Sequence, residues 1–387
     1  MESFVSFVPT RLYFGVGETR RLGEETARIG RHALLVTGKD SAYRTGLQER
    51  TVGLLRGAGV KVSELRGVEP NPRLSTCLKG AEICRAEGID VIAAVGGGSV
   101  LDAAKTVAAA ALDTGDIWDV FLNEREVSRA LPLVTLVTLA ATGSELNPHS
   151  VIINEKTGQK YSLHSEHVYP RVSILDPQLT VTVPRTPTVH GAVDIIAHAL
   201  EGYITAEGCS PLSDRMVEGI CLCVMKSTER VLDNPEDLDA RSDLMWCSTM
   251  ACSGYAGAGY GRKYYDGHQI GHELSAAYDL AHGATLSALL PGVMTFHVKN
   301  HAAKLARFAR RVFDVEGSRS ETEADIGARG IRSLKAWCST VGAPVTLKEM
   351  GVRKEDLPGI ARRVVKNPEA QNLTETDVMT ILSTSFE

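Results

Sequence analysis

Several features of secreted, membrane-bound and nucleic-acid-binding proteins are missing from this sequence of 387 residues. No uncharged apolar run reaches the roughly 18 residues of a membrane span. Residues 1–15 lack a basic segment followed by an apolar stretch, so no secretory signal peptide is expected. The net charge is −5 and both signs are interspersed, which leaves no basic face for nucleic acid or an anionic membrane. We therefore expect a cytoplasmic protein that binds neither.

Cysteine pairs of the C-x-x-C type are also absent, although the chain contains eight cysteines. A chain of this length can form a hydrophobic core without disulfides. We expect reduced thiols packed in apolar surroundings and assign them no chemistry.

The first half of the chain alternates short apolar runs with helical patterns. Strands are predicted at residues 32–37, 60–65, 90–95 and 131–138, with further extended segments at 150–153 and 171–175. Helices are predicted between them, at 45–57, 74–87 and 100–112. Because the strands are almost continuously apolar, we expect a parallel sheet with helices on both faces, in a Rossmann-like arrangement.

From about residue 184 the periodicity is helical almost throughout, with turns predicted at 233–235, 291–292 and 342–344. We therefore expect an α/β domain over residues 1–183 and an all-α domain over residues 184–387. A ligand should lie between the carboxyl ends of the strands and the second domain.

Three glycines and a serine, Gly96–Ser99, follow the strand predicted at 90–95 and precede a helix. Glycines allow a tight turn whose backbone N–H groups approach a phosphate at the positive end of the helix. Asp102 and Lys105 lie in the first turns, where they could orient the loop or a nucleotide. Since neither GxGxxG nor GxxxxGK[ST] is present, an ordinary strand–helix turn explains this segment equally well.

A second polar turn, residues 138–145 (TLAATGSE), follows the next strand. The hydroxyls of Thr138 and Thr142 could hydrogen-bond a nicotinamide amide or a ribose, and Lys160 could reach a ribose or a phosphate. A solvated loop and a surface lysine are equally good explanations.

The second half contains histidines and a carboxylate at helical spacing. Asp194 and His198 are four residues apart, as are His268 and His272, and His282 follows after a loop. A spacing of four places both side chains of a pair on one helix face, where both can reach one ion. Imidazoles with a carboxylate and no thiolate indicate Fe²⁺ or Zn²⁺ rather than a closed structural zinc site.

Five stretches together resemble the iron-containing alcohol dehydrogenase family, and the resemblance covers nearly the whole chain. They are EPNP (69–72), GGGSVLDAAK (96–105), ATGSE (141–145), DIIAHALEGY (194–203) and GHQIGHELSAAYDLAHGATLSALLP (267–291). The forms VTLAATGSE and GHELSA resemble the branch of butanol dehydrogenases and broad aldehyde reductases. The resemblance implies a metal- and NAD(P)-dependent oxidoreductase that interconverts a primary alcohol and its aldehyde, with aldehyde reduction favoured.

The resemblance also implies roles for individual residues. The ion, expected to be Fe²⁺ with Zn²⁺ as the alternative, would be held by Asp194, His198, His268 and His282. His272 would lie beside the nicotinamide and relay a proton. The cofactor-binding residues would be Asn71, Gly97, Gly98, Ser99, Asp102, Thr138, Thr142, Asn147, Lys160 and Leu179.

The choice of nicotinamide cofactor is expected to depend on the end of the first Rossmann-like strand. Gly38 and Lys39 can accommodate a 2′-phosphate, which favours NADP(H) over NAD(H), although the neighbouring Asp40 acts in the opposite direction. The family resemblance implies a homodimer, formed through the strand near residues 7–14.

Three alternative functions remain at this stage. A lyase like dehydroquinate synthase would need Lys or Arg near the metal, and none occurs around residues 194–203 or 268–282. A polyol oxidoreductase like glycerol dehydrogenase would use the same fold. A metal-dependent hydrolase would act without nicotinamide.

Overall fold

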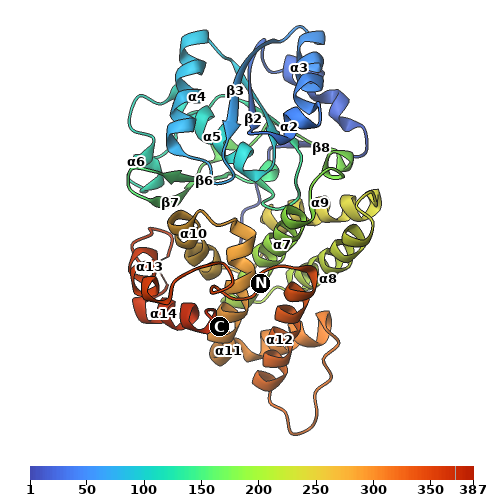
Figure 1. Ribbon diagram of the computed structural model, residues 1–387, viewed down its shortest axis with the longest axis vertical. Coiled ribbons are helices and arrows are strands. Elements are labelled where there is room, and N and C mark those ends of the chain that lie inside the picture. The colour runs from blue at the N-terminus through green and yellow to red at the C-terminus, as the bar shows by residue number, and fades with distance from the viewer. Residues whose placement is uncertain (371) are drawn as a thin grey trace. The chain divides into compact units, whose positions relative to one another are not determined.

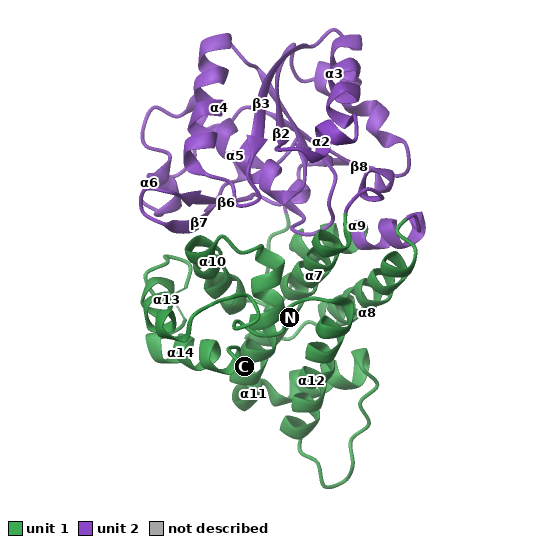
Figure 2. Cartoon of the chain, in the orientation of Figure 1, with its two compact units in different colours: residues 1–6, 184–235, 246–387 green, residues 7–183, 236–245 purple. Residues whose placement is uncertain are grey.

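The computed structural model describes residues 1–370 and 372–387, which form two compact units (Figure 1, Figure 2). The sheet unit comprises residues 7–183 and 236–245, and the helical unit comprises residues 1–6, 184–235 and 246–387. The segments 1–6 and 236–245 thus each belong to the unit formed mainly by the other half of the chain. Within the described part, no helix combines the length and hydrophobicity that a membrane span requires.

The sheet unit contains a six-stranded sheet in the order β1-β8-β5-β4-β2-β3, in which every pair of neighbours is parallel. Its strands are β1 (Arg11–Phe14), β2 (His32–Gly38), β3 (Lys61–Val68), β4 (Val91–Gly96), β5 (Leu133–Val137) and β8 (Val172–Leu175). An antiparallel hairpin is formed by β6 (His149–Asn154) and β7 (Gln159–His164). The predicted parallel Rossmann-like sheet is confirmed.

Helices cover both faces of this sheet. Successive residues of the central strands point to opposite faces, so each face has an apolar cluster that helices can cover. Leu34 and Val36 of β2 belong to one apolar cluster, whereas Ala33 and Leu35 belong to the other. The helices of the unit are α1 (Leu22–Ala27), α2 (Ser41–Arg44), α3 (Leu47–Gly57), α4 (Leu74–Glu87), α5 (Gly98–Leu112) and α6 (Trp118–Phe121).

The helical unit is built almost entirely from α-helices, as predicted for this part of the chain. They are α7 (Arg185–Thr205), α8 (Pro211–Asp233), α9 (Leu238–Cys252, which begins in the sheet unit), α10 (Asp266–Tyr278), α11 (His282–Val312), α12 (Glu323–Val341), α13 (Leu357–Val364) and α14 (Glu375–Thr384). Short 3₁₀ turns complete the two units: η1 (Glu18–Arg21), η2 (Ser144–Leu146), η3 (Glu166–Val168), η4 (Pro177–Thr180), η5 (Tyr255–Gly257) and η6 (Lys354–Asp356).

The turn predicted at Pro291 and Gly292 is wrong, because α11 continues through both residues. Proline removes one backbone donor, but a helix packed on several sides can retain its course. The non-helical residue of α11 is instead His301, with φ −129° and ψ 31°. Gly292 serves helix packing, since a Cβ there would lie 2.1 Å from Oγ of Ser385, beside the end of α14.

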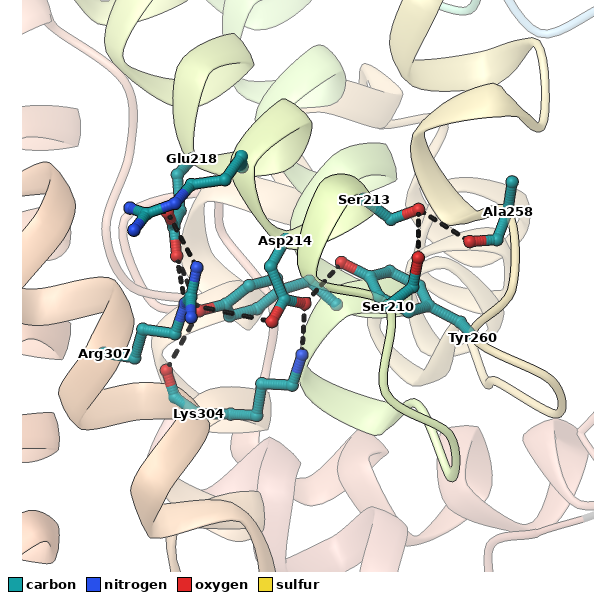
Figure 3. A network of polar contacts seen from close by, with 10 residues as sticks. Ser210, Ser213, Asp214, Glu218, Ala258, Tyr260, Lys304 and Arg307 are labelled. Atoms are coloured by element: carbon teal, nitrogen blue, oxygen red, sulfur yellow. Dashed lines mark hydrogen bonds and ion pairs between the residues drawn. The ribbon is translucent and has the colours of Figure 1, made fainter. Parts of the chain in front are cut away.

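Buried ion pairs join α8 to α11 within the helical unit (Figure 3). Oδ1 of Asp214 accepts a hydrogen bond from the hydroxyl of Tyr260 at 2.9 Å and also pairs with Lys304. Glu218, one turn along α8, pairs with Arg307. Buried carboxylates are costly without such partners, so this network fixes the packing of the two helices and of the segment after η5.

Candidate metal centre and nucleotide turns

One face of α7 carries Asp194, His198 and Glu201. Their spacings of four and three residues place them one turn apart in succession, on the same side of the helix. Asp194 is 3% exposed and Glu201 is completely buried, so this polar stripe faces the interior of the helical unit. Such a stripe requires polar or charged partners from neighbouring helices.

Those partners include histidines from α10 and α11. The Nε2 atoms of three histidines surround Oδ1 of Asp194: His198 at 3.6 Å, His268 at 3.8 Å and His282 at 3.7 Å. All three distances exceed the upper limit of about 3.2 Å for an ordinary N–H···O hydrogen bond. The three imidazole nitrogens therefore converge on Oδ1 of Asp194 at distances longer than an ordinary hydrogen bond.

This convergence fits a divalent metal ion. Ligand atoms of Asp194, His268 and His282 all lie within 4.8 Å of one another. Two ligands at about 2.0–2.2 Å from a tetrahedral ion are separated by about 3.3–3.6 Å, close to the distances observed here. Burial, together with the neighbouring His268, holds the pKa of His198 well below its usual value, so that its ring is neutral and can offer a lone pair.

Glycines allow the three helices to approach closely at this point. A Cβ at Gly283, the residue after His282, would lie 2.1 Å from the carbonyl oxygen of His190 in α7. A Cβ at Gly271 in α10 would lie 2.9 Å from Oγ1 of Thr285 in α11. Side chains at either position would force the helices apart and separate the histidines from Asp194.

His272 lies one turn beyond His268 on α10 and is 6% exposed. Its ring centroid is 5.2 Å from that of His282. The ring of His272 therefore lies next to the cluster that contains Asp194, His268 and His282.

Glu201 is a site residue that the sequence prediction missed. Its Oε1 lies 2.8 Å from Nδ1 of His268, and its Oε2 accepts a hydrogen bond from the N–H of Gly267 at 2.8 Å. Burial and the nearby carboxylate of Asp266 raise the pKa of Glu201 above its usual value, whereas the backbone N–H groups of Gly267 and His268 lower it. The spacing of seven residues from Asp194, which places Glu201 on the same helix face, could have identified it.

In the sheet unit, the two turns predicted to bind nucleotide are in direct contact. The N–H of Thr138 donates to the carbonyl oxygen of Gly96 at 3.0 Å. A Cβ at Gly98 would lie 2.3 Å from Oγ1 of Thr142, and one at Gly97 would lie 3.2 Å from Cβ of Leu139. Glycine is thus required at 98, because any side chain would displace the second turn.

The start of α5 can accept an anion. Gly98 and Ser99 occupy its first turn, where backbone N–H groups have no acceptor within the helix. The N-terminal end of a helix also attracts negative charge, as a pyrophosphate would require. The hydroxyl of Ser99 donates to the carbonyl oxygen of Pro70, so the residue offers its backbone rather than its side chain.

A buried lysine fixes the second turn. Four oxygens surround Nζ of Lys105 and share its three N–H donors: Oγ of Ser144 at 2.8 Å, the backbone and side-chain oxygens of Asn147 at 2.9 and 3.0 Å, and the carbonyl oxygen of His149 at 2.8 Å. Oδ1 of Asp102 accepts from the same Ser144 hydroxyl at 2.6 Å. Burial lowers the pKa of Lys105 to about 8, while Asp102 opposes that shift, so the ammonium is retained at neutral pH.

These contacts link Lys105, Asp102 and Asn147 to the second turn. Lys105 is 0% exposed and its ammonium group is surrounded by oxygens of the chain. The side-chain oxygen of Asn147 also accepts from the N–H of His149 at 3.0 Å. All three residues hold the shape of the turn from within.

The remaining predicted nucleotide residues lie around the same end of the sheet. Nζ of Lys160 on β7 donates to Oδ1 of Asn71 at 3.0 Å, and both residues are buried. Gly38 ends β2 near Val100 of α5, with a hypothetical Cβ 3.7 Å from Cγ2 of that residue. Lys39 is exposed beyond the strand, and Leu179 lies in η4.

Two family models match this chain. The family model for iron-containing alcohol dehydrogenases matches residues 9–177, and the model for the C-terminal part of that family matches residues 188–386. The chain belongs to the iron-containing alcohol dehydrogenase family. Membership implies a divalent metal ion and a nicotinamide cofactor.

Among its relatives in the iron-containing alcohol dehydrogenase family are butanol dehydrogenases and an aldehyde reductase. The chain is 39% identical to the probable NADH-dependent butanol dehydrogenase 1 of Bacillus subtilis, over 100% of both chains. It is 33% identical to the NADPH-dependent aldehyde reductase YqhD of Escherichia coli, over 96% of this chain and 95% of that protein. The resemblance stated from sequence motifs is therefore confirmed.

Solved structures of family members have the same fold. The crystal structure of NADH-dependent butanol dehydrogenase A from Thermotoga maritima superposes with a TM-score of 0.96 at 38% identity. The superposition covers 100% of this chain and 99% of the Thermotoga maritima chain. The predicted fold class, a Rossmann-like α/β part followed by a helical part, is that of an iron-containing alcohol dehydrogenase.

Proposed function

We propose that this enzyme reduces short or medium aliphatic aldehydes to primary alcohols, and catalyses the reverse oxidation, with a nicotinamide cofactor as the hydride carrier. The observation that supports this most directly is the placement of three imidazole nitrogens at 3.6–3.8 Å around Oδ1 of Asp194. Similarity to butanol dehydrogenases and to an aldehyde reductase supports this substrate class.

In this proposal Asp194, His198, His268 and His282 hold the divalent ion, which we expect to be Fe²⁺, with Zn²⁺ as the alternative. A bound ion would act as a Lewis acid on the substrate oxygen. His272 supplies or removes the proton of the alcohol, because imidazole exchanges protons near neutral pH.

The nucleotide is held by the sheet unit in this proposal. Backbone N–H groups of Gly98 and Ser99 bind the pyrophosphate, and Thr138, Thr142 and Leu179 line the nicotinamide ribose. Asn71, Asp102, Asn147 and Lys160 are proposed to contact the cofactor as well, and their hydrogen bonds hold them in place: Lys160 donates to Asn71, Ser144 donates to Asp102 and Asn147 donates to the carbonyl oxygen of Gly143.

We further propose that NADP(H) is preferred over NAD(H). This preference depends on Lys39, whose exposed ammonium can pair with a 2′-phosphate beside Gly38 at the end of β2. The relatives include an enzyme named as dependent on NADH and one named as dependent on NADPH. The proposed preference for NADP(H) therefore depends on Lys39 alone.

A homodimer is proposed through the outer edge of β1. This strand lies at the end of the sheet order and pairs with β8 on one side. Phe7, which precedes it, and Val16, which follows it, are 50% and 55% exposed. An exposed strand edge flanked by apolar side chains is suited to pairing with a second chain. Light scattering after size-exclusion chromatography should give twice the mass of one chain; a monomer would rule out this interface.

The experiment that tests the proposed function measures metal content and turnover on the same sample. Protein loaded with Fe²⁺ or Zn²⁺ should oxidise NADPH stoichiometrically with butanal, and chelation should abolish both bound metal and turnover. Full turnover after chelation would refute the proposal. A lyase like dehydroquinate synthase would give no net change in NADPH, and an enzyme like glycerol dehydrogenase would prefer polyols to simple alcohols.

A further inference from the structure

The carboxylate of Glu201 contacts both the backbone and the ring of one candidate ligand. Oε1 lies 2.8 Å from Nδ1 of His268. Oε2 accepts hydrogen bonds from the N–H groups of Gly267 at 2.8 Å and of His268 at 3.4 Å. These N–H groups lie in the first turn of α10, where no helical acceptor exists, so a residue of α7 supplies the acceptor from outside the helix.

The contact with Nδ1 determines which ring nitrogen carries the lone pair that can coordinate a metal. A neutral imidazole carries one proton, on either Nδ1 or Nε2. When Nδ1 donates to the carboxylate, the lone pair is at Nε2, the atom that lies 3.8 Å from Oδ1 of Asp194. The opposite tautomer would direct an N–H group toward the ion and could not coordinate it.

We propose that Glu201 is a positioning residue of the metal centre, which fixes the tautomer and the orientation of His268 and thereby sets metal affinity. The inference rests on the proposed function, since it concerns the same ion. Glu201 acts through His268 and is not itself a ligand: its two oxygens are occupied by contacts with α10.

A glutamine cannot reproduce this arrangement. Its amide has one acceptor oxygen and one NH₂ group. In Glu201, Oε2 accepts from the backbone N–H of Gly267 and Oε1 contacts Nδ1 of His268, so both oxygens serve as acceptors. If the NH₂ group faces Nδ1 of His268, it favours the tautomer with the proton on Nε2. If it faces Gly267, two donors oppose each other and the ring is displaced.

The test compares wild type with E201Q, using metal-free proteins titrated with Zn²⁺ against a chromophoric chelator and with Co²⁺ by visible absorption. We expect about 10- to 100-fold weaker Zn²⁺ binding in E201Q and an altered Co²⁺ spectrum. The matched control is Y260F, which removes a 2.9 Å hydrogen bond to the buried carboxylate of Asp214 in the same unit (Figure 3). The control should lose stability but keep wild-type affinity and spectrum. Wild-type affinity and spectrum in E201Q would overturn the inference.

A second pair of variants decides the matter if E201Q does not fold. A Cβ at Gly267 would lie 2.7 Å from Oε1 of Glu201, so G267A should displace the carboxylate without removing it. Gly219, an exposed glycine of α8 with nothing within 4 Å of a hypothetical Cβ, provides the control variant G219A. We expect weaker metal binding in G267A only, and equal affinities would contradict the inference.

Failure of the inference can be distinguished from failure of the proposed function. If wild type takes up neither Zn²⁺ nor Co²⁺, the proposed metal centre and the role of Glu201 fall together. If wild type binds metal and reduces butanal while E201Q binds metal equally well, the function stands and only the positioning role of Glu201 is refuted.

Discussion

The helical unit forms its candidate site from side chains, whereas the sheet unit forms its candidate site mainly from backbone. In the helical unit the site consists of side chains, three imidazoles and a carboxylate directed at one point from α7, α10 and α11. In the sheet unit it consists mainly of backbone, two turns held in contact by glycine and by buried Lys105. Loss of a functional group should therefore inactivate the first site, whereas added volume or lost support should distort the second.

The largest effect is expected from H268A, which removes one side chain of the cluster. Bound metal should be lost, and kcat/KM for butanal should fall by roughly 10³-fold or more, because Lewis-acid stabilisation contributes several kcal/mol. Metal analysis and NADPH oxidation on the same sample check this. H301A, which removes a histidine at the irregular point of α11, is the control and should retain both properties.

The next largest effect is expected from G98A, which tests the backbone-built site. Its Cβ would lie 2.3 Å from Oγ1 of Thr142, so the second turn must move. The KM for the cofactor should rise about tenfold or more, while metal content stays at the wild-type level. G53A, placed in α3 with nothing within 4 Å of its Cβ, should leave the KM unchanged. A loss of metal in G98A would contradict the proposal that the helical unit binds the metal and the sheet unit binds the cofactor.

A more moderate effect on turnover, with a clear loss of stability, is expected from K105M. The substitution leaves the oxygens of Ser144, Asn147 and His149 buried without their ammonium donor. Breaking such a contact costs about 3 kcal/mol or more, which corresponds to a drop in Tm of roughly 5–10 °C. Thermal unfolding with and without saturating NADPH should show the loss, together with a raised cofactor KM. An unchanged Tm would mean that Lys105 does not support the turn.

The smallest effect is expected from K39A, because the residue is exposed and solvent screens its charge. The ratio of kcat/KM with NADPH to that with NADH should fall about threefold, since one exposed charge-assisted contact to the 2′-phosphate is lost. The control is K79A, which removes an exposed lysine of α4. If K39A and K79A give the same ratio as wild type, cofactor preference is decided elsewhere.

The parts of the fold that depend on local pattern could be predicted from the sequence. The apolar runs of β2, β4 and β5 are buried strands because only a sheet covered on both faces accommodates them. β7 was not predicted, since its residues Gln159–His164 include several polar side chains that become buried only in the hairpin. The prediction of a turn at Pro291 was wrong because packing along α11, which the local sequence does not reveal, outweighs the local cost of proline.

The candidate site could be predicted in part. The spacing of four residues identified Asp194 with His198 and His268 with His272, because it follows directly from helix geometry. The spacing of seven residues places Glu201 on the same helix face as Asp194, but its contact with His268 could not be predicted, since it depends on how α7 packs against α10. Likewise, Lys105 is next to the glycine turn in sequence, but its burial against the second turn requires the folded sheet.

The hydrogen bonds of Glu201 also have a kinetic consequence. Helix ends open more readily than helix interiors, on timescales that amide hydrogen exchange can follow. Opening of the first turn of α10 would break the bonds from Gly267 and His268 to Glu201 in the same event that frees the ring of His268. The residence time of a bound ion should therefore follow the opening rate of this helix end, so that exchange at these two amides and metal release slow down or speed up together.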